Sequence, residues 1–395
     1  MPANLGKVLF ILGLGFIVLG LNSISEAQTE KIVRVAVVTD ASQIELVVRC
    51  PYQIFALNTN EVLYKGRKFW WAKKVVPTES GIKIGKVDFK IYGVRIQPSK
   101  SPAIYLNGRR FRGAIDIIRQ PNKGLLAVNH LDVDEYVSGV LYHEVAPRWP
   151  MEVLRAQAIV ARTFALYQAK INAHKDYDLV STAYSQVYGG RTSERGRTSK
   201  AVRLTKDKVL TYKNKIFPTF YHATCAGHTE DANNLWKINI PPLRGRECQF
   251  CQRSPHFHWK AKVSLKDIEE ALERAGHKVG LIKAIEIVDR DISGRITELE
   301  VTSTRGKIEM DAYHFRLAVG PNIIKSANFT LEIKKKAAYF NGYGWGHGVG
   351  MCQWGAFFMA KKGFNAKQIL GYYYPESRIR NIEEIRNASG EIETF

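Results

Sequence analysis

The sequence predicts an α+β protein, with an N-terminal antiparallel β-domain followed by a mixed helical and β core that carries an inserted β-subdomain. Short β-runs separated by turn residues fill residues 31–128. Two helical patterns joined by a proline-containing turn occupy residues 131–172, and further β-runs interrupt the chain at 264–336. Strands and helices that are segregated along a chain in this way are typical of α+β folds.

The N-terminal domain has the pattern of an antiparallel sheet. Runs such as IVRVAVV, QIELVV and DFKIYGVRIQP are separated by turn residues, among them Asn107 and Gly108. Strands of this length are expected to form a small barrel or a sandwich, which protects their edges. Trp70 and Trp71 leave two interpretations open, because their rings can stack on a sugar or pack in a core or interface.

Two helices with apolar faces are expected after the β-domain. Asp134 is the expected cap of the first helix, which then begins at Glu135. Pro150 is well placed as a first-turn proline of the second helix. Arg162 lies about 80° from the centre of the small-residue face of that helix, at roughly 100° per residue. It can pair with Glu144, bind an anionic group of a substrate, or be solvated.

Glu144 projects from the apolar face of the first helix. It follows Val137 by seven residues, Val140 by four and Leu141 by three, and this spacing places all four on one face. Acids are almost never fully buried without a partner. Periodicity alone favours a structural acid that pairs with an arginine or caps the next loop. The alternative is a general acid/base whose pKa is raised by desolvation.

The charge and the N-terminus define the expected surroundings. A net charge of +21, spread along the chain, suits an extended anionic partner such as nucleic acid, cell-wall polymer or anionic lipid. Residues 1–27 have the layout of a secretory signal peptide, with Lys7, an apolar run at 8–21, and Ser25 and Ala27 before the cleavage point. An uncleaved anchor is the alternative, although the apolar run is short for a membrane span.

Either layout places the folded part outside the cytoplasm, in the periplasm or the cell-wall zone. Nucleic acid is therefore not expected as a partner, and wall polymer is. Contact with a membrane is expected only through an uncleaved N-terminus.

Residues 222–259 gather cysteines and histidines. Cys248 and Cys251 form a C-x-x-C, and Cys225 lies 23 residues before Cys248. Three thiols and one imidazole would complete a tetrahedral structural zinc site. The alternatives are a disulfide that involves Cys225, or neither. A catalytic zinc is not expected, because the chain has no H-E-x-x-H motif.

Residues 342–355 read GYGWGHGVGMCQWG, and six of these fourteen residues are glycine. The motif matches neither a dinucleotide fingerprint nor a phosphate loop. Alternating glycines let a backbone approach a ligand closely, and Trp345, His347 and Gln353 are candidate substrate contacts. The alternative is a tight packing loop in which only glycine fits. The polar residues 376–395 are expected to form a frayed tail.

Together these segments resemble the sporulation stage II protein D family, also called the SpoIID or LytB amidase-enhancer family. The matching pieces are LDVDEYVSGVLYHEVAPRWPMEVLRAQAIVARTFAL, STAYSQVYGG, FYHATCAGHTED with the later CQFCQRSPHFHW, and GYGWGHGVGMCQWGA. They occur in the family's order and cover most of 104–375, the expected SpoIID-like domain. The resemblance implies a catalytic acid at Glu144 and an important arginine at Arg162. Gln186 and Tyr188, in the second piece, are further expected substrate contacts.

The resemblance implies activity on peptidoglycan. Sporulation members are lytic transglycosylases that act on glycan strands stripped of stem peptides. They cut between N-acetylmuramic acid and N-acetylglucosamine and leave a 1,6-anhydro product. Other members are described as enhancers of a partner amidase.

Two departures from the family pattern concern metal binding. The T-H-C-Q-x-Y zinc segment of some members is TAYSQVY here, so any metal is expected at the separate cysteine cluster. Serine often stands where this chain has Cys352, and this small-residue exchange is given no role.

The expected chemistry follows from a single acid. Hydrolysis of a glycosidic bond usually needs two carboxylates, and Asp134 and Glu135 have the positions of helix-start residues. Glu144 acting alone, first as acid and then as base, fits intramolecular transglycosylation. The expected function is a lytic transglycosylase that requires no cofactor. The alternative is a non-catalytic glycan-binding protein that enhances a partner N-acetylmuramoyl-L-alanine amidase.

Overall fold

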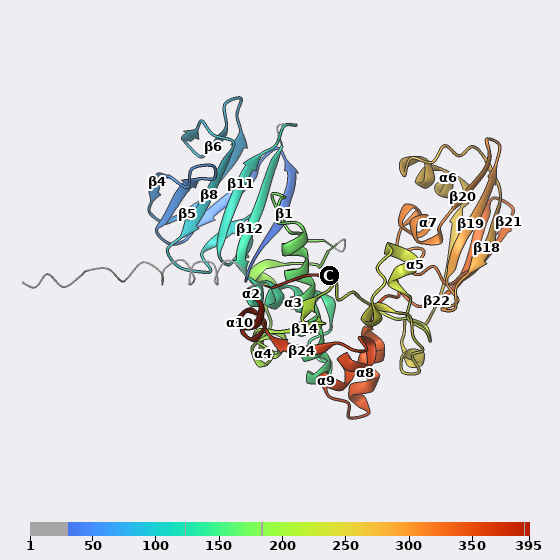
Figure 1. The fold of residues 1–395 in the computed structure, drawn as a ribbon. Helices are drawn as coiled ribbons and strands as arrows, with labels where there is room; N and C mark the ends of the chain where they lie inside the picture. Colours follow the sequence, from blue (N-terminus) through green and yellow to red (C-terminus); the bar gives the residue numbers. More distant parts are fainter. Residues whose placement is uncertain (1–30, 123, 183–184, 391) are drawn as a thin grey trace, which may run out of the picture.

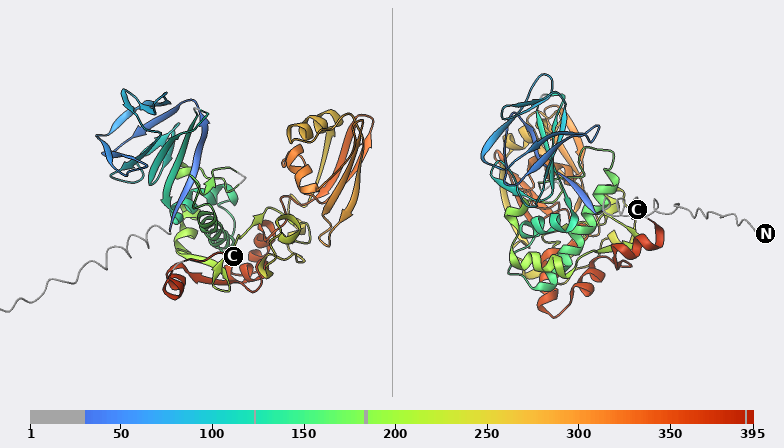
Figure 2. Two further views of the ribbon diagram at one scale, coloured as in Figure 1. Left: turned by 45° about the horizontal axis from the view of Figure 1, so that its top comes forward. Right: turned by 90° about the vertical axis from the view of Figure 1, so that its left-hand side faces the viewer.

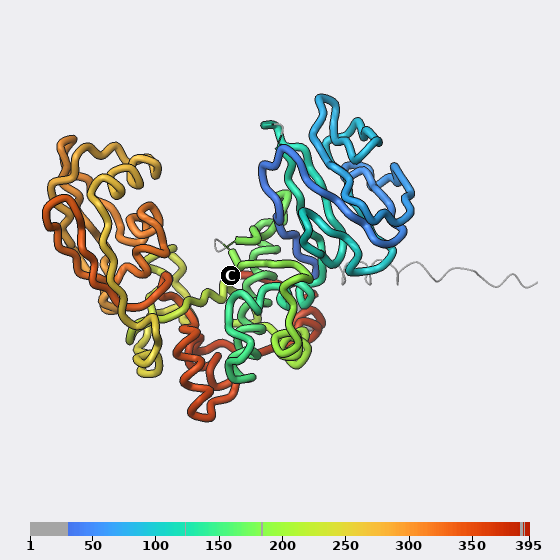
Figure 3. The backbone as a smooth tube through the Cα atoms, turned by 180° about the vertical axis from the view of Figure 1, so that it is seen from behind, coloured from blue at the N-terminus to red at the C-terminus, as the bar shows by residue number. Residues whose placement is uncertain are grey.

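The computed structural model describes residues 31–122, 124–182, 185–390 and 392–395. The N-terminal β-domain and the inserted subdomain form two arms on a central helical body (Figure 1). The V-shaped arrangement of the arms is visible in the left view of Figure 2 and from behind in Figure 3. The expected signal peptide, 1–27, lies outside the described residues. In the described part of the chain, no helix is long and apolar enough to cross a membrane.

The N-terminal domain is a sandwich of two sheets. The strand orders are β13-β1-β12-β11-β8-β3-β4 and β10-β9-β2-β5-β6-β7. The pairs are antiparallel, except that β13 from the helical body pairs in parallel with β1. Apolar side chains of both sheets share one core. The strands are β1 Ile32–Ala41, β2 Ile44–Val48, β3 Tyr52–Ala56, β4 Val62–Gly66, β5 Phe69–Pro77, β6 Ile82–Ile84, β7 Val87–Phe89, β8 Gly93–Pro98, β9 Ile104–Leu106, β10 Arg109–Phe111, β11 Ala114–Arg119, β12 Leu125–Asp132 and β13 Leu179–Val180.

Trp70 and Trp71 do not lie in the core of the sandwich. Both are on β5, and their exposed fractions are 57% and 89%. Arg49 and Lys68 place their cationic groups over the ring of Trp70. The core interpretation of this pair is therefore wrong, while its contacts with a sugar or a partner remain a prediction.

The helical body is centred on α2 (Val133–Glu144) and α3 (Met151–Ile171). The cap of α2 is Asp132, whose side chain accepts a hydrogen bond from the backbone N–H of Asp134. The prediction of Asp134 as the cap was thus displaced by two residues. Pro150 is the N-cap residue of α3, one position before the expected first turn.

The C-terminal residues are part of the body. β24 (Arg378–Asn381) pairs with β14 (Lys208–Tyr212), and β15 (Lys215–Ile216) completes a three-stranded sheet. Helix α10 (Ile382–Ser389) follows, and Ile382, Ile385 and Ile392 are buried. The prediction of a frayed tail at 376–395 is therefore wrong, because three buried isoleucines are enough to dock this polar segment.

The inserted subdomain packs helices α6 and α7 with two three-stranded sheets, β17-β22-β21 and β18-β19-β20. Ser264 caps α6 by accepting a hydrogen bond from the backbone N–H of Asp267. The subdomain is wider than the expected 264–336, because His258 pairs with Tyr343 at its base. Its elements are β17 His258–Ser264, α6 Leu265–Arg274, β18 Ile282–Arg290, β19 Ile296–Ser303, β20 Gly306–Met310, α7 Ala312–Val319, β21 Phe329–Lys334 and β22 Ala337–Tyr343.

Short elements join this subdomain to the body. β16 (Tyr221–His222) pairs in parallel with β23 (Met351–Cys352), so the glycine-rich motif lies against the start of the cysteine region. The remaining helices of the body and the linker are α4 Gly196–Leu204, α5 Ala232–Trp236, α8 Gln353–Lys361 and α9 Ala366–Tyr373, with short 3-10 turns at Gly190–Ser193, Pro241–Leu243 and Cys251–Arg253.

Candidate active site

Glu144 is the last residue of α2 and is half-buried at the end of an apolar face. Val137, Val140 and Leu141 on that face are fully buried, as the periodicity predicts. A carboxylate at this end of a helix faces the negative pole of the helix dipole. The position therefore disfavours the charged form of Glu144 before any partner is considered.

Two hydrogen-bond donors contact the Glu144 carboxyl group. The backbone N–H of Val187 donates to Oε1 at 3.1 Å, and the hydroxyl of Tyr221 is the second donor. Burial raises the pKa of Glu144 to about 7, and the two hydrogen bonds oppose this rise. Within the described residues, no cationic side chain is among the groups that shift this pKa. Glu144 consequently keeps its proton up to about neutral pH.

Tyr221 is itself held from two sides. The side-chain amide of Gln186 donates to the Tyr221 hydroxyl at 3.2 Å, and Nε2 of His347 lies 3.0 Å from the Tyr221 carbonyl oxygen. The backbone N–H of Val349 donates to Nδ1 of His347, so Nε2 carries the hydrogen. Burial and the neighbouring His222 lower the pKa of His347. The imidazole is thus a neutral donor that fixes the backbone beside Glu144.

Gln353 is buried behind Glu144. Its side-chain amide donates to the Glu144 carbonyl oxygen at 3.1 Å and to Oε1 of Gln157 at 3.3 Å. Gln353 begins α8, so these bonds tie the glycine-rich motif to the C-terminal end of α2 and to the second turn of α3. Of the predicted substrate contacts, Gln186, His347 and Gln353 therefore surround Glu144, and they hold it in place.

Arg162 does not pair with Glu144. Its side chain has an exposed fraction of 0%, and its guanidinium binds the carboxylate of Asp134 on α2, with Nε at 2.7 Å from Oδ1. A further hydrogen bond runs from Nη1 to the carbonyl oxygen of Lys208 on β14, at 2.9 Å. The expectation that Arg162 contacts substrate is therefore not met in this structure. A fully buried and fully bonded guanidinium joins three elements of the body instead.

Tyr188 and Trp345 also lie away from Glu144. The ring of Tyr188 is buried, and its hydroxyl donates to Oδ1 of Asn129 at 2.9 Å. Trp345 is half-buried between His256, at 4.7 Å between ring centroids, and the ammonium of Lys325, at 4.8 Å. Tyr188 is thus a core residue where the helical body meets the β-sandwich. Trp345 presents part of its ring to solvent.

The glycines of the motif are explained by close packing. Gly344, Gly346, Gly348 and Gly350 all have φ between +71° and +112°. A Cβ on Gly350 would lie 2.0 Å from the Phe220 carbonyl oxygen. The packing interpretation thus accounts for the glycines, and the side chains between them supply the polar contacts.

Four cysteine thiols meet where this motif crosses the cysteine region. The sulfurs of Cys225, Cys248, Cys251 and Cys352 all lie within 4.8 Å of one another, and all four residues are buried. They form no disulfide. The backbone N–H groups of Cys225 and Gly355 both donate to Sγ of Cys352 at 3.3 Å. The cluster is compatible with a metal site.

The fourth position of this cluster is a thiol and not the expected imidazole. Cys352 had no role in the sequence, because it lies 101 residues after Cys251 and only the fold brings them together. Tyr221 was missed for a similar reason, since nothing in its local sequence separates it from a core tyrosine. Both residues do stand inside segments that carry the family resemblance.

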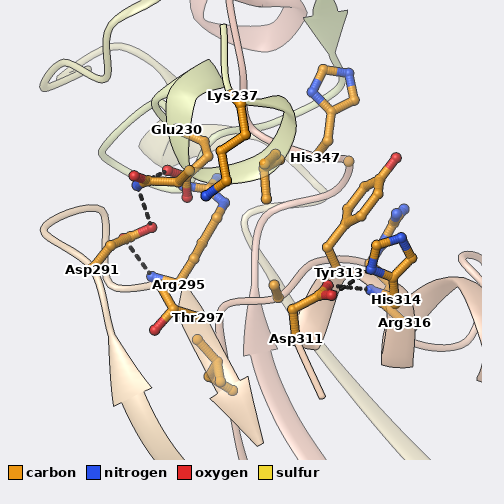
Figure 4. Close-up of a pocket in the computed structure, with 15 residues that line it drawn as sticks. Glu230, Lys237, Asp291, Arg295, Thr297, Asp311, Tyr313, His314, Arg316 and His347 are labelled. Atoms are coloured by element: carbon orange, nitrogen blue, oxygen red, sulfur yellow. Dashed lines mark hydrogen bonds and ion pairs between the residues drawn. The ribbon is translucent and has the colours of Figure 1, made fainter. Parts of the chain in front are cut away.

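A cavity of about 440 Å³ lies beside this site, between α5, the β18–β19 turn, α7 and the glycine-rich motif (Figure 4). His347 lines it and also contacts Tyr221. Glu144 itself is not among the lining residues. The cavity is therefore connected to Glu144 through His347, which lines it, and Tyr221, which bonds to both His347 and Glu144.

Comparison with known proteins agrees with these features. A family model described as "Stage II sporulation protein" matches residues 121–212, and a domain of unknown function matches 230–350. An uncharacterized protein of Brachyspira hyodysenteriae is 31% identical over 366 residues, which cover 90% of this chain and 94% of that protein. Stage II sporulation protein D of Bacillus subtilis is 28% identical over 289 residues, 69% of this chain and 81% of that protein. The chain belongs to the SpoIID family.

This SpoIID-family chain is also similar to the amidase enhancer of Bacillus subtilis. The identity is 26% over 347 residues, which cover 74% of this chain and 48% of that protein. The resemblance stated from the sequence motifs is confirmed, and both family names, sporulation protein and amidase enhancer, occur among the relatives.

Proposed function

We propose that this protein is a lytic transglycosylase that cleaves glycan strands of peptidoglycan between N-acetylmuramic acid and N-acetylglucosamine, with Glu144 as its only general acid/base. The observation that carries the proposal is the environment of Glu144. Its pKa of about 7 and its two neutral donors suit a group that must both give and take a proton near neutral pH.

The reaction needs one proton to circulate. Glu144 donates its proton to the glycosidic oxygen as the bond from that oxygen to the muramic C1 breaks. The resulting carboxylate accepts the proton of the muramic 6-hydroxyl as its oxygen bonds to C1. Glu144 ends protonated, the strand ends in a 1,6-anhydro ring, and no water is consumed. Tyr221 and the Val187 N–H stabilise the transient carboxylate.

The absence of a second acid supports this route over hydrolysis. Within the described residues, no carboxylate is among the groups that shift the pKa of Glu144. Retaining and inverting hydrolases both place a second carboxyl group within about 5–10 Å of the first. A single acid with an internal nucleophile from the sugar needs no such partner.

Digestion of purified, peptide-free glycan strands tests the proposal. The wild-type protein is expected to release products with 1,6-anhydro ends, identified by mass. Glu144→Gln should lower the rate by about 10²–10⁴-fold, the usual contribution of a general acid/base. Glu135→Gln, at the other end of α2, is the matched control and should keep the rate. Anhydro products from Glu144→Gln at the wild-type rate would refute the assignment.

Similarity to the amidase enhancer gives the same experiment a second arm. A partner N-acetylmuramoyl-L-alanine amidase is added to intact wall, with and without this protein. Stimulated amidase release, together with no glycan cleavage by the protein alone, would favour the enhancer function. In that case Glu144→Gln should stimulate as well as the wild type does.

We also propose that the four thiols bind a structural Zn²⁺. Tetrahedral zinc with bonds of about 2.3 Å keeps its sulfurs about 3.8 Å apart, which suits a cluster whose sulfurs lie within 4.8 Å. Hydrogen bonds from the other three thiols lower the pKa of Cys248, so a thiolate is favoured before an ion binds. Zinc would hold the glycine-rich motif against the cysteine region and thereby support Gln353 and Glu144.

Metal analysis of the purified protein tests the zinc site. One zinc per chain is expected in the wild type and in Cys50→Ser, whose sulfur lies in the sandwich outside the cluster. Cys352→Ser should lose most of the metal and lower the Tm. Full zinc content in Cys352→Ser would show that this thiol is not a ligand.

The basic surface and the N-terminal pattern support a location outside the cytoplasm, where wall glycan is the available polyanion. Fractionation of cells that express the full chain tests this location.

A further inference from the structure

The cavity beside His347 contains a buried cation without a counter-charge. Arg316 on α7 lines the cavity and has an exposed fraction of 7%. Its Nε has no hydrogen-bond partner, and no acid pairs with its guanidinium in the part of the chain that the structure describes. A buried charge without a partner is strongly unfavourable. The position of Arg316 therefore suits the binding of an anionic ligand.

The other arginine of the cavity, Arg295, differs because both of its terminal nitrogens have partners, although its Nε has none among the described residues. Arg295 donates to the carbonyl oxygens of His228 at 3.0 Å and Cys225 at 2.9 Å, and to the hydroxyl of Ser293 at 3.0 Å. It supports the fold of the cysteine region and adds a second positive charge beside Arg316. Burial first, and then this neighbouring charge, lower the pKa of Arg316 to about 10.

The acids of the cavity are also committed. Asp291 accepts from the N–H and the hydroxyl of Ser293, at 2.8 and 2.6 Å. Glu230 accepts from Asn234 at 2.9 Å, and its Oε2 lies 3.0 Å from the Ser293 hydroxyl, whose one proton goes to the nearer Asp291. Burial and then the hydrogen bond with Asp291 raise the pKa of Glu230 to about 7, so the two acids share a proton. Figure 4 shows this pair on the side of the cavity near Arg295.

Asp311 is occupied as well, because it caps α7 through the N–H of His314 at 2.7 Å. The unsatisfied charge of the cavity is therefore that of Arg316, with Lys237 on the opposite side. A single anionic group of modest size would complete the site.

The walls of the cavity suit a sugar. His347 and Tyr313 line it, and the ring of Trp236 contacts both, with centroid distances of 5.1 and 6.1 Å. Flat aromatic faces with a few polar groups, in a volume of about 440 Å³, are typical of small-ligand sites. His347 lines the cavity and also bonds to the backbone of Tyr221, whose hydroxyl contacts Glu144, so two residues connect the cavity to the acid.

We propose that the cavity is a subsite for a muramic acid residue and that Arg316 binds its free lactyl carboxylate. The inference rests on the proposed function. The carboxylate is present only where the stem peptide has been removed, since in peptide-bearing strands it is an uncharged amide. Arg316 is then a specificity-determining residue that selects stripped strands by charge.

Binding of three small probes tests the subsite. The probes are N-acetylmuramic acid, its lactyl methylamide and N-acetylglucosamine, measured by calorimetry with the full-length protein. The wild type is expected to bind N-acetylmuramic acid at least tenfold more tightly than the two neutral probes. Arg316→Met should remove the difference, and Arg316→Lys should retain part of it, because lysine keeps the charge but not the planar fork.

Stability distinguishes this role from a structural one. Removal of an unpaired buried charge should leave the Tm of Arg316→Met equal to or above that of the wild type without ligand. N-acetylmuramic acid should raise the Tm of the wild type and should not raise that of Arg316→Met. Arg305→Gln, an exposed arginine of the same subdomain, is the matched control and should bind as the wild type does. A large fall in Tm for Arg316→Met, or a preference that survives the substitution, would overturn the proposal.

The same variants separate the two proposals. If the wild type never cleaves strands but its preference for the acidic probe depends on Arg316, the subsite stands and the transglycosylase proposal fails. If Glu144→Gln abolishes cleavage while Arg316→Met binds the acidic probe normally, the subsite fails and the transglycosylase proposal stands.

Discussion

Glu144 and Arg162 lie on neighbouring helices of the same body, and both ionisable groups are withdrawn from water, yet their environments are opposite. Arg162 binds the carboxylate of Asp134 and a strand carbonyl, so its charge is balanced and its position is fixed. Glu144 meets one backbone N–H and one phenol, so its charge is not balanced. The difference that separates the proposed catalytic acid from the structural arginine is therefore the missing counter-charge, more than burial alone.

The largest expected effect tests the structural side of this comparison. Arg162→Leu leaves Asp134 and the Lys208 carbonyl without their partner and should lower the free energy of unfolding by about 3–5 kcal/mol. Urea denaturation of the protein, followed by circular dichroism, measures this change in the free energy of unfolding. Arg155→Leu on the same helix is the control, because its pair with Glu152 is solvated and worth about 1 kcal/mol or less. Equal losses in both variants would contradict the structural role of Arg162.

A smaller effect, of opposite sign, tests the uncompensated acid. The folded-state pKa of Glu144 is about 7, above an unfolded value of about 4.3. The folded state therefore binds the extra proton, and this stabilisation is complete below the unfolded pKa and is lost as the pH rises to about 7. Glu144→Gln should be more stable than the wild type at pH 8, by on the order of 1–3 kcal/mol, and not at pH 4. Thermal unfolding at the two pH values measures this, and a difference independent of pH would disprove it.

The smallest effect refines the acid itself. Tyr221 donates to the Glu144 carboxylate, so Tyr221→Phe should raise the pKa of Glu144 further. Loss of one hydrogen bond of about 1 kcal/mol corresponds to less than one pH unit. The pH at which strand cleavage falls off should move upward by that amount. Tyr142→Phe, an exposed tyrosine on the same helix, should leave the profile in place. A downward movement for Tyr221→Phe would mean that the phenol does not stabilise the carboxylate.

Local periodicity predicted the features that depend on one helix or one strand run. It placed Glu144 on the apolar face of α2 and predicted the strands of the sandwich. Arg162 was expected at the border of its face, yet it is fully buried, and its partner could not be predicted because Asp134 belongs to another helix. The burial and the partner of a charged side chain at such a border depend on which element packs against it.

Long-range contacts account for what the sequence missed. The C-x-x-C identified Cys248 and Cys251. Cys352 lies beyond the inserted subdomain in the sequence, and only the fold brings it to them. Residues 376–395 appear polar because their three buried isoleucines are spaced over eleven positions. In the sequence, Arg316 cannot be distinguished from other helical arginines. Only the structure shows that no described acid pairs with it.

The pairing of His258 with Tyr343 brings both ends of the inserted subdomain to one point, next to the four thiols. Whatever lies between those ends contributes no strand to the sandwich or to the sheet of the helical body. The insertion is thus attached to the rest of the chain through two ends that lie side by side. Arg295 of the insertion donates to the carbonyl oxygens of His228 and Cys225, so the insertion also supports the backbone that carries the cysteine cluster.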